Sequence, residues 1–173
     1  MVSGEWGVVG RLETADAALA AQLNAMVRGS GLGRALAVGS ATWLAGVEVL
    51  LMGALALAGR RRSALRMLAA VGLVFIVSEV LGSLWARKRP FAQLADVEPL
   101  VTHTAQRSFP SRHVASGLAM AAIGRSAHPQ LGLAMTSVAW LLGLSRVATG
   151  LHYPSDVLAG ALLGSIIGRL LRE

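Results

Sequence analysis

Two histidines in this chain have neighbours that fit phosphoryl transfer through a histidine nucleophile. His152 is followed one helical turn later by Asp156. A carboxylate at that spacing could accept the proton of one ring nitrogen and leave the other nitrogen free to attack phosphorus. His113, in a separate polar segment, could protonate the oxygen of the leaving group. The pattern predicts a nucleophile, an orienting carboxylate and a general acid.

Basic residues near both histidines could bind the transferred anion. Arg89, Arg112 and Arg146 can each donate a planar pair of hydrogen bonds to phosphate, and Lys88 adds a compact positive charge. Guanidinium groups and backbone donors would stabilise the charge of the phosphoryl group in place of Mg²⁺. We therefore expect no metal and no cofactor.

Two prolines predict helix starts beside the histidines. Pro110 and Pro154 suit the first turn of a helix, where the missing backbone donor costs nothing. A helix that begins at the first of these prolines would point the N–H groups of Ser111, Arg112 and His113 out of its N-terminus. Such an N-terminus is a favourable place for a phosphate.

The composition places this chemistry in a membrane protein. The 173 residues are 54% hydrophobic and only 14% charged, and the mean hydropathy is +0.60. That polar content cannot cover a water-soluble globule, and it excludes disordered and collagen-like chains. There is no cysteine, which excludes disulfides, zinc–cysteine sites and a thiol nucleophile. The net charge of +7 is consistent with nucleic-acid binding, anchoring at a membrane surface or recognition of an anionic ligand.

Apolar stretches predict an all-α, integral membrane helical bundle of about five to six spans with an N-terminal amphipathic helix. The stretches are 35–58, 67–86, 114–124 with a start extended to Pro110, 131–150 and 157–171. Residues 1–34 are expected to lie at the interface as an amphipathic helix with Asp16 as its N-cap. The predicted division is therefore an interfacial segment, 1–34, and a transmembrane phosphatase domain, 35–173.

The order of the spans brings the polar segments to one side of the membrane. Segments 87–112 and 146–156 share a side, whereas the basic loop 59–66 lies on the other with Arg125, Arg169 and Arg172. Short basic loops stay in the cytoplasm, so the polar segments are expected to face outward from the inner (plasma) membrane. Whether residues 1–34 also cross the membrane is left open by the sequence.

Small residues predict which helix faces point inward. Gly160, Gly164 and Gly168 recur every four residues, and this spacing lets a neighbouring helix approach closely. Asp156 lies on the same stripe, one turn earlier. His113 shares a face with Gly117 in the same way. Both polar residues are therefore expected to point into the bundle.

The three polar segments together resemble the type 2 phosphatidic acid phosphatase superfamily, whose motifs read KxxxxxxRP, PSGH and SRxxxxxHxxxD. The third motif matches at Ser145, Arg146, His152 and Asp156. The second appears as PSRH at 110–113, with arginine in place of glycine.

The first motif is incomplete. It keeps Arg89 and Pro90, but the lysine of the family falls on Gly82, and Lys88 or Arg87 could replace it. The resemblance implies metal-independent hydrolysis of a lipid phosphate. The implied catalytic residues are His152, His113 and Asp156, and the implied substrate-binding residues are Lys88, Arg89, Ser111, Arg112, Ser145 and Arg146.

Smaller features point to one branch of this superfamily. The RPF sequence at 89–91, the Leu100 to His103 spacing and SFPSxH at 108–113 resemble bacterial undecaprenyl-diphosphatases. That branch implies hydrolysis of undecaprenyl diphosphate to undecaprenyl phosphate for envelope synthesis. Phosphatidate and phosphatidylglycerophosphate remain alternative substrates.

Other functions compete with this hypothesis. Glu48 and Glu79, the acids inside predicted spans, could line the ion path of a transporter, although the charges gather at one face rather than at mid-membrane. Glu79 could equally pair with an arginine, and either acid could be neutral inside the bundle. A vanadate-dependent haloperoxidase or a non-catalytic lipid-binding protein are further alternatives. The arginine run lacks interleaved aromatic residues, so no nucleic acid partner is expected.

Overall fold

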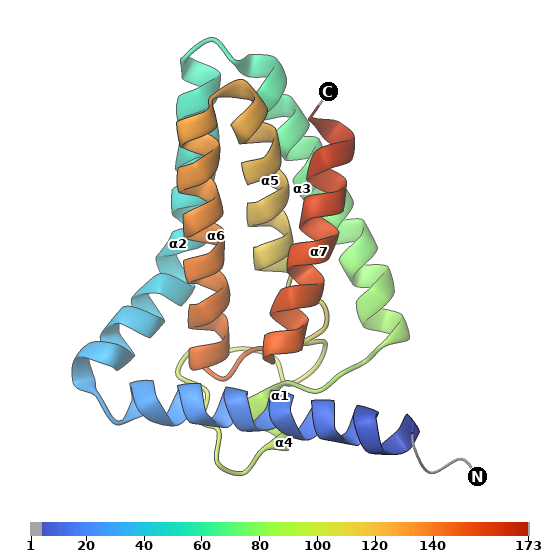
Figure 1. The fold of residues 1–173 in the computed structure, drawn as a ribbon. Helices are drawn as coiled ribbons and strands as arrows, with labels where there is room; N and C mark the ends of the chain where they lie inside the picture. Colours follow the sequence, from blue (N-terminus) through green and yellow to red (C-terminus); the bar gives the residue numbers. More distant parts are fainter. Residues whose placement is uncertain (1–4, 173) are drawn as a thin grey trace.

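The computed structural model describes residues 5–172, with side chains from residue 10 onward, and this part of the chain is helical without strands. Its helices are α1 (Glu5–Arg28), α2 (Gly31–Leu57), α3 (Arg61–Leu84), α4 (Pro90–Gln93), α5 (Arg112–Ala127), α6 (Pro129–Ala148) and α7 (Pro154–Leu171). Figure 1 shows α2, α3, α6 and α7 running lengthwise around α5, while α1 crosses one end of the bundle. The predicted all-α membrane bundle is confirmed.

Four helices, α2, α3, α6 and α7, are long and apolar enough to cross a membrane. The fifth lengthwise helix, α5, has only 16 residues, and nine of them are buried on several sides of the helix. By contrast, α2 buries four of its 27 residues. Because α5 is surrounded by protein, its short length need not match the lipid, and it forms the core of the bundle.

The connections between helices lie alternately at the two ends of the bundle, as the sequence predicts. The α3–α5 and α6–α7 connections lie at the end crossed by α1 (Figure 1). The α2–α3 and α5–α6 turns and the end of α7 lie at the opposite end. The polar segments 87–112 and 146–156 therefore meet at one end.

Three local predictions are wrong. The basic loop 59–66 is mostly helix, because α3 begins at Arg61 and only a short turn around Gly59 (φ 83°) remains. Asp16 is not an N-cap, because α1 begins at Glu5 and places Asp16 in mid-helix. Pro110 precedes α5 rather than opening it, since the helix begins at Arg112. Pro154, by contrast, occupies the first turn of α7.

The glycine stripe on α7 packs directly against the backbone of α5. A β-carbon at Gly160 would lie 2.4 Å from the carbonyl oxygen of Ser111, and one at Gly164 would lie 2.1 Å from that of Ala115. At Gly168 the corresponding distance to the Ala119 oxygen is 2.7 Å. The predicted packing role is confirmed, because no side chain fits between the two helices.

Replacing Gly164 by alanine should therefore separate α5 from α7. The added carbon would overlap a backbone oxygen, and we expect a loss of roughly 1–3 kcal/mol in unfolding free energy. Gly53, on α2, has nothing within 4 Å of an added β-carbon, so Gly53→Ala is the matched control. Thermal unfolding in detergent should show a lower midpoint for Gly164→Ala alone. Equal midpoints in both variants would contradict the packing argument.

Candidate active site

His152 lies in the connection between α6 and α7 and is only 4% exposed. Its Nε2 atom is 3.2 Å from Nη1 of Arg89, and its Nδ1 atom is 3.6 Å from Oδ2 of Asp156. The second distance exceeds that of a hydrogen bond, but Asp156 is the carboxylate that faces this edge of the ring. Burial lowers the pKa of His152 to about 4, although Asp156 acts in the opposite direction. The ring is therefore neutral at pH 7, as a nucleophile requires.

Arg89 forms one wall of the site. It is 3% exposed, and the turn into α4 fixes it because Pro90 opens that helix. Its Nη1 atom donates to the carbonyl oxygen of Leu151 at 2.7 Å, which ties it to the residue before His152. Burial and the positive charge of Arg146 lower the pKa of Arg89 to about 10, so the guanidinium stays charged at pH 7.

His113 and Arg146 form a second pair of site residues in contact with each other. His113 is the second residue of α5, and Arg146 lies in the last turn of α6, 5% exposed. Nη2 of Arg146 is 2.8 Å from Nδ1 of His113. The same Nη2 atom also lies close to Nε2 of His113, so a neutral His113 ring can accept from this guanidinium through one nitrogen, whereas a protonated ring has no acceptor. The structure thus brings together the two histidines and two arginines that the sequence selects from three separate segments.

Several buried polar atoms in this cluster have no hydrogen-bond partner among the described residues. They are Nε of Arg89, Nε of Arg146, Oγ of Ser111 and Nδ1 of His152. Buried polar groups are rarely left unsatisfied, and each such group needs an explanation. Two guanidinium groups and a hydroxyl are donors suited to phosphate oxygens. The cluster can therefore bind a compact anion beside His152.

Asp156 is held by a second network that the sequence analysis missed. Its Oδ1 atom accepts from Arg87 Nη1 at 2.8 Å, and its Oδ2 atom accepts from the Tyr153 backbone N–H at 2.9 Å. Arg87 also donates through Nη2 to Asp16 of α1 at 2.7 Å. Burial alone would lower the pKa of Arg87, but Asp16 and Asp156 together raise it. A chain of contacts thus runs from α1 to the orienting carboxylate.

Asp16 also fixes the start of α7. Its Oδ1 atom accepts from the Ser155 backbone N–H at 2.9 Å, and its Oδ2 atom accepts from the Ser155 hydroxyl. The sequence signal at Asp16 was that of an N-cap ahead of an alanine-rich run. That signal alone did not identify a partner 139 positions away.

The other residues selected from the sequence lie around the cluster in different ways. Lys88 is exposed, and its side chain makes no hydrogen bond with the described residues. Arg112 turns toward α3, where its Nη1 atom is 3.6 Å from Glu79 and its guanidinium is 5.4 Å from the ring centre of Phe75. The hydroxyl of Ser145 donates to the Leu142 carbonyl at 2.8 Å.

One expected donor is already engaged. The backbone N–H of Ser111 donates to the Asp156 carbonyl oxygen at 3.0 Å, so the prediction that it points outward for a phosphate is wrong. Ser111 is the N-cap of α5, one residue before the helix. Its backbone therefore joins the starts of α5 and α7 instead.

The two acids of uncertain role have different surroundings. Glu79 pairs with Arg107 and Arg112, which confirms the pairing alternative. Glu48 is 1% exposed within α2 and has no hydrogen-bond partner among the described residues.

At Gly82, where the family has lysine, an added β-carbon would lie 3.2 Å from the Phe109 oxygen. That position therefore packs against the segment before α5. Within residues 10–172, no group of three His, Cys, Asp or Glu side chains could hold a metal ion.

A family model described as PAP2 superfamily matches residues 63–172 of the chain. Those 110 residues include most of α3 and all of α4 to α7, and with them both histidines and all three polar segments. The N-terminal helices α1 and α2 lie outside the match.

Several curated bacterial proteins are similar in sequence. The "Bacitracin transport permease protein BcrC" of Bacillus licheniformis is 38% identical over 53% of this chain and 47% of its own length. The "Undecaprenyl-diphosphatase BcrC" of Bacillus subtilis is 33% identical over 55% of this chain and 49% of its own length. The "Decaprenylphosphoryl-5-phosphoribose phosphatase" of Mycobacterium tuberculosis is 34% identical over 70% of this chain and 66% of its own length. The chain thus spans about half to two thirds of these relatives.

Among solved structures, that of Aquifex aeolicus LpxE is similar in fold. The TM-score is 0.73 at 25% identity, and the match covers 87% of this chain and 92% of the LpxE chain. Because this match extends beyond residues 63–172, the N-terminal part of the bundle takes part in the likeness as well.

The Asp16 contacts predict that α1 depends on this residue for its position. Asp16→Ala removes the partner of Arg87 and of the Ser155 N–H, and losing such buried partners costs about 1–3 kcal/mol each. We expect faster amide hydrogen exchange in residues 12–28 and at Ser155, measured by mass spectrometry. Glu13→Ala, an exposed acid on the same helix, is the control and should leave exchange unchanged. Identical exchange in the two variants would show that Asp16 does not hold α1.

Proposed function

The chain belongs to the PAP2 superfamily, and from this membership and the geometry of the site we propose that it is a membrane lipid phosphatase with His152 as nucleophile. The observation that carries the proposal is the position of the His152 ring. One nitrogen faces the Asp156 carboxylate, and the other faces the guanidinium of Arg89. A phosphoryl group bound by Arg89 would therefore lie next to the free nitrogen.

The proposed first step forms a phosphohistidine. Nε2 of His152 attacks phosphorus while the bond from phosphorus to the leaving oxygen breaks. His113, which would bind a proton once the phosphate engages Arg146, gives that proton to the leaving oxygen and becomes neutral. Asp156 holds the Nδ1 proton and stabilises the positive charge that develops on the ring. Arg89 and Arg146 stabilise the negative charge on the phosphoryl oxygens.

The second step returns the enzyme to its starting state. His113, now neutral, takes a proton from a water molecule as that water attacks the phosphohistidine. The P–N bond breaks, inorganic phosphate leaves, and Nε2 of His152 recovers its lone pair. His113 thus loses one proton in the first step and regains one in the second. The arginines supply the positive charge that a metal ion supplies in other phosphoryl-transfer enzymes.

The remaining selected residues have proposed roles in binding. Ser111 offers an unsatisfied hydroxyl to the phosphate, and Ser145 supports the last turn of α6 that carries Arg146. Lys88 and Arg112 lie farther out and would meet the rest of the headgroup. For a diphosphate, these outer cations would bind the phosphate that remains on the lipid.

We propose undecaprenyl diphosphate as the substrate, with undecaprenyl phosphate and inorganic phosphate as products. The support is the similarity to a protein named undecaprenyl-diphosphatase, together with the RPF and SFPSRH sequences. A second candidate is a phosphate monoester on a polyprenyl-linked sugar. The support is the similarity to the decaprenylphosphoryl-5-phosphoribose phosphatase, which matches 70% of this chain, against 55% for the undecaprenyl-diphosphatase. Phosphatidate and phosphatidylglycerophosphate are further candidates.

The proposed location is the inner (plasma) membrane, with the site on the extracytoplasmic side. Residues 1–34 would form the interfacial segment and 35–173 the transmembrane phosphatase domain. The position of α1 across one end of the bundle supports an interfacial role (Figure 1). The basic turn between α2 and α3 at the opposite end supports the orientation.

Substitution of His152 tests the mechanism directly. His152→Ala should lower phosphate release by at least 10³-fold, because the nucleophile is lost. His128→Ala is the control and should keep full activity, because His128 caps α6 at the other end of the bundle. Wild-type activity should persist in EDTA. Full activity in His152→Ala, or complete loss in EDTA, would contradict the mechanism.

A comparison of substrates tests the proposed specificity. We expect phosphate release from undecaprenyl diphosphate to exceed that from a phosphorylated polyprenyl sugar, phosphatidate or phosphatidylglycerophosphate by at least tenfold in kcat/KM. The physical reason is that Lys88 and Arg112 can bind a second phosphate directly joined to the reacting one. Phosphatidate has no second phosphate, and in the other two lipids a sugar or a glycerol separates the two phosphates. A preference for any monoester would leave the phosphohistidine mechanism intact but overturn the diphosphate assignment.

A further inference from the structure

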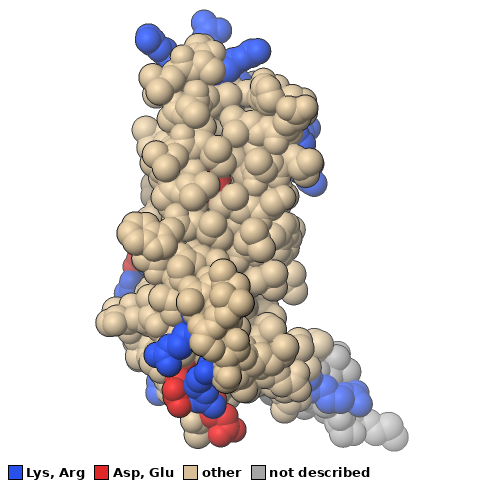
Figure 2. Space-filling view, turned by 90° about the vertical axis from the view of Figure 1, so that its left-hand side faces the viewer, with Lys and Arg blue, Asp and Glu red and all other residues tan. Residues whose placement is uncertain are grey.

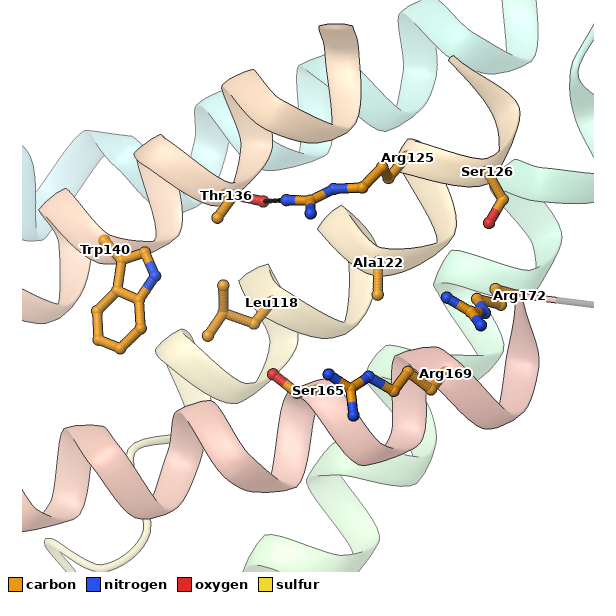
Figure 3. Close-up of a pocket in the computed structure, with 9 residues that line it drawn as sticks. All are labelled: Leu118, Ala122, Arg125, Ser126, Thr136, Trp140, Ser165, Arg169 and Arg172. Atoms are coloured by element: carbon orange, nitrogen blue, oxygen red, sulfur yellow. Dashed lines mark hydrogen bonds between the residues drawn. The ribbon is translucent and has the colours of Figure 1, made fainter. Parts of the chain in front are cut away.

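A second basic cavity lies at the opposite end of the bundle from His113 and His152. It has a volume of about 330 Å³ and lies between α5, α6 and α7, open on one side (Figure 3). Its polar lining consists of three arginines, Arg125, Arg169 and Arg172, and three hydroxyl residues, Ser126, Thr136 and Ser165. These residues belong to none of the motifs that the proposed reaction uses.

The arginines converge on this cavity from two different helices. Arg125 lies in the last turn of α5, Arg169 lies in the last turn of α7, and Arg172 caps α7. Nη2 of Arg125 donates to Oγ1 of Thr136 at 3.0 Å, which directs the guanidinium across the cavity toward α6 (Figure 3). Arg66 of α3 donates to the carbonyl oxygen of Arg172 at 3.1 Å and fixes the end of α7.

The positive charge of this cavity is not neutralised within the described part of the chain. No ion pair joins any of the three arginines to an Asp or Glu there, and no carboxylate lines the cavity. At the other end of the protein, Arg87, Arg107 and Arg112 each have a carboxylate partner. Three convergent guanidinium groups with hydroxyls between them are suited to a phosphate group.

The rest of the cavity wall is apolar. Ala122 lies between the arginines, and Leu118 and Trp140 line the cavity farther toward the middle of the bundle (Figure 3). The lining therefore changes from charged to apolar along the helix axis. A free phosphate ion would use only the charged part, whereas a phospholipid would fill both parts.

We propose that this cavity binds an anionic phospholipid of the leaflet at the arginine end. The phosphate of the headgroup would lie among Arg125, Arg169 and Arg172, and an acyl chain would lie along Leu118 and Trp140. Basic pockets between membrane helices bind anionic headgroups in this manner. The arginines of the α2–α3 turn do not line this cavity, so they serve as internal controls.

The test compares three ligands that share the phosphate chemistry. Purified full-length protein in neutral detergent is titrated with dioleoyl phosphatidylglycerol, with dioleoyl phosphatidylcholine, or with inorganic phosphate. Retained lipid is measured by native mass spectrometry, and the unfolding temperature is measured in parallel. We expect phosphatidylglycerol to be retained and to raise the unfolding temperature, and the other two ligands to have little effect.

Paired variants locate the binding. The double variant Arg125→Gln/Arg169→Gln should weaken phosphatidylglycerol binding at least tenfold, whereas Arg60→Gln/Arg61→Gln, with the same loss of charge, should bind as the wild type does. Equal weakening in both double variants would mean general surface attraction and would overturn the proposal. An equal response to inorganic phosphate would overturn the assignment to a lipid. These readouts do not depend on catalysis, so the proposed phosphatase activity can fail independently.

Discussion

The close approach of α5 and α7 is the constraint on which the rest of the structure depends. Gly160, Gly164 and Gly168 leave no room for a side chain between α7 and the α5 backbone, so the two helices have one register. At the end of this contact nearest α1, the Ser111 N–H donates to the Asp156 carbonyl oxygen. The start of the helix that carries His113 is therefore fixed against the start of the helix that carries Asp156. The two histidines, 39 positions apart in sequence, come to face one anion site because of this backbone contact.

The electrostatics of the site follow from which charges are paired and which are not. Asp156 and Asp16 are both committed to Arg87, and Asp156 also faces His152. These pairs leave Arg89 and Arg146 buried without a carboxylate partner among the described residues. Burying two guanidinium groups near enough to repel each other is costly unless an anion binds between them. In the proposed reaction, a bound phosphoryl group supplies the negative charge that these two guanidinium groups lack.

Much of this architecture could be predicted from the sequence, and the failures have a common cause. Apolar length predicts the spans, glycine spacing predicts that a neighbouring helix approaches residues 160–168 closely, and chain order predicts which polar segments meet. Asp16 was misassigned because its role depends on the path of α1 across the bundle end, which no local pattern encodes. Likewise, the N–H of Ser111 was expected to be free. It donates to the Asp156 carbonyl oxygen of another helix, and no local sequence pattern indicates that contact. Periodicity reports which face is buried, but not which partner lies there.

The distribution of charge also supports one orientation in the membrane, although a simple count of basic residues does not. Nine Lys and Arg lie at the site end, counting α1 and the start of α2, and seven lie at the opposite end. Figure 2 shows acidic side chains beside the basic ones at the site end, whereas only basic side chains appear at the other end. Several site-end arginines are paired with carboxylates or buried in the anion site. Arginines engaged in this way exert little electric field outside the protein.

The exposed arginines of the opposite end are then the dominant signal for orientation, because short basic segments stay in the cytoplasm. The same end carries the basic cavity that we propose for an anionic headgroup, and this proposal agrees with the anionic lipids of a cytoplasmic leaflet.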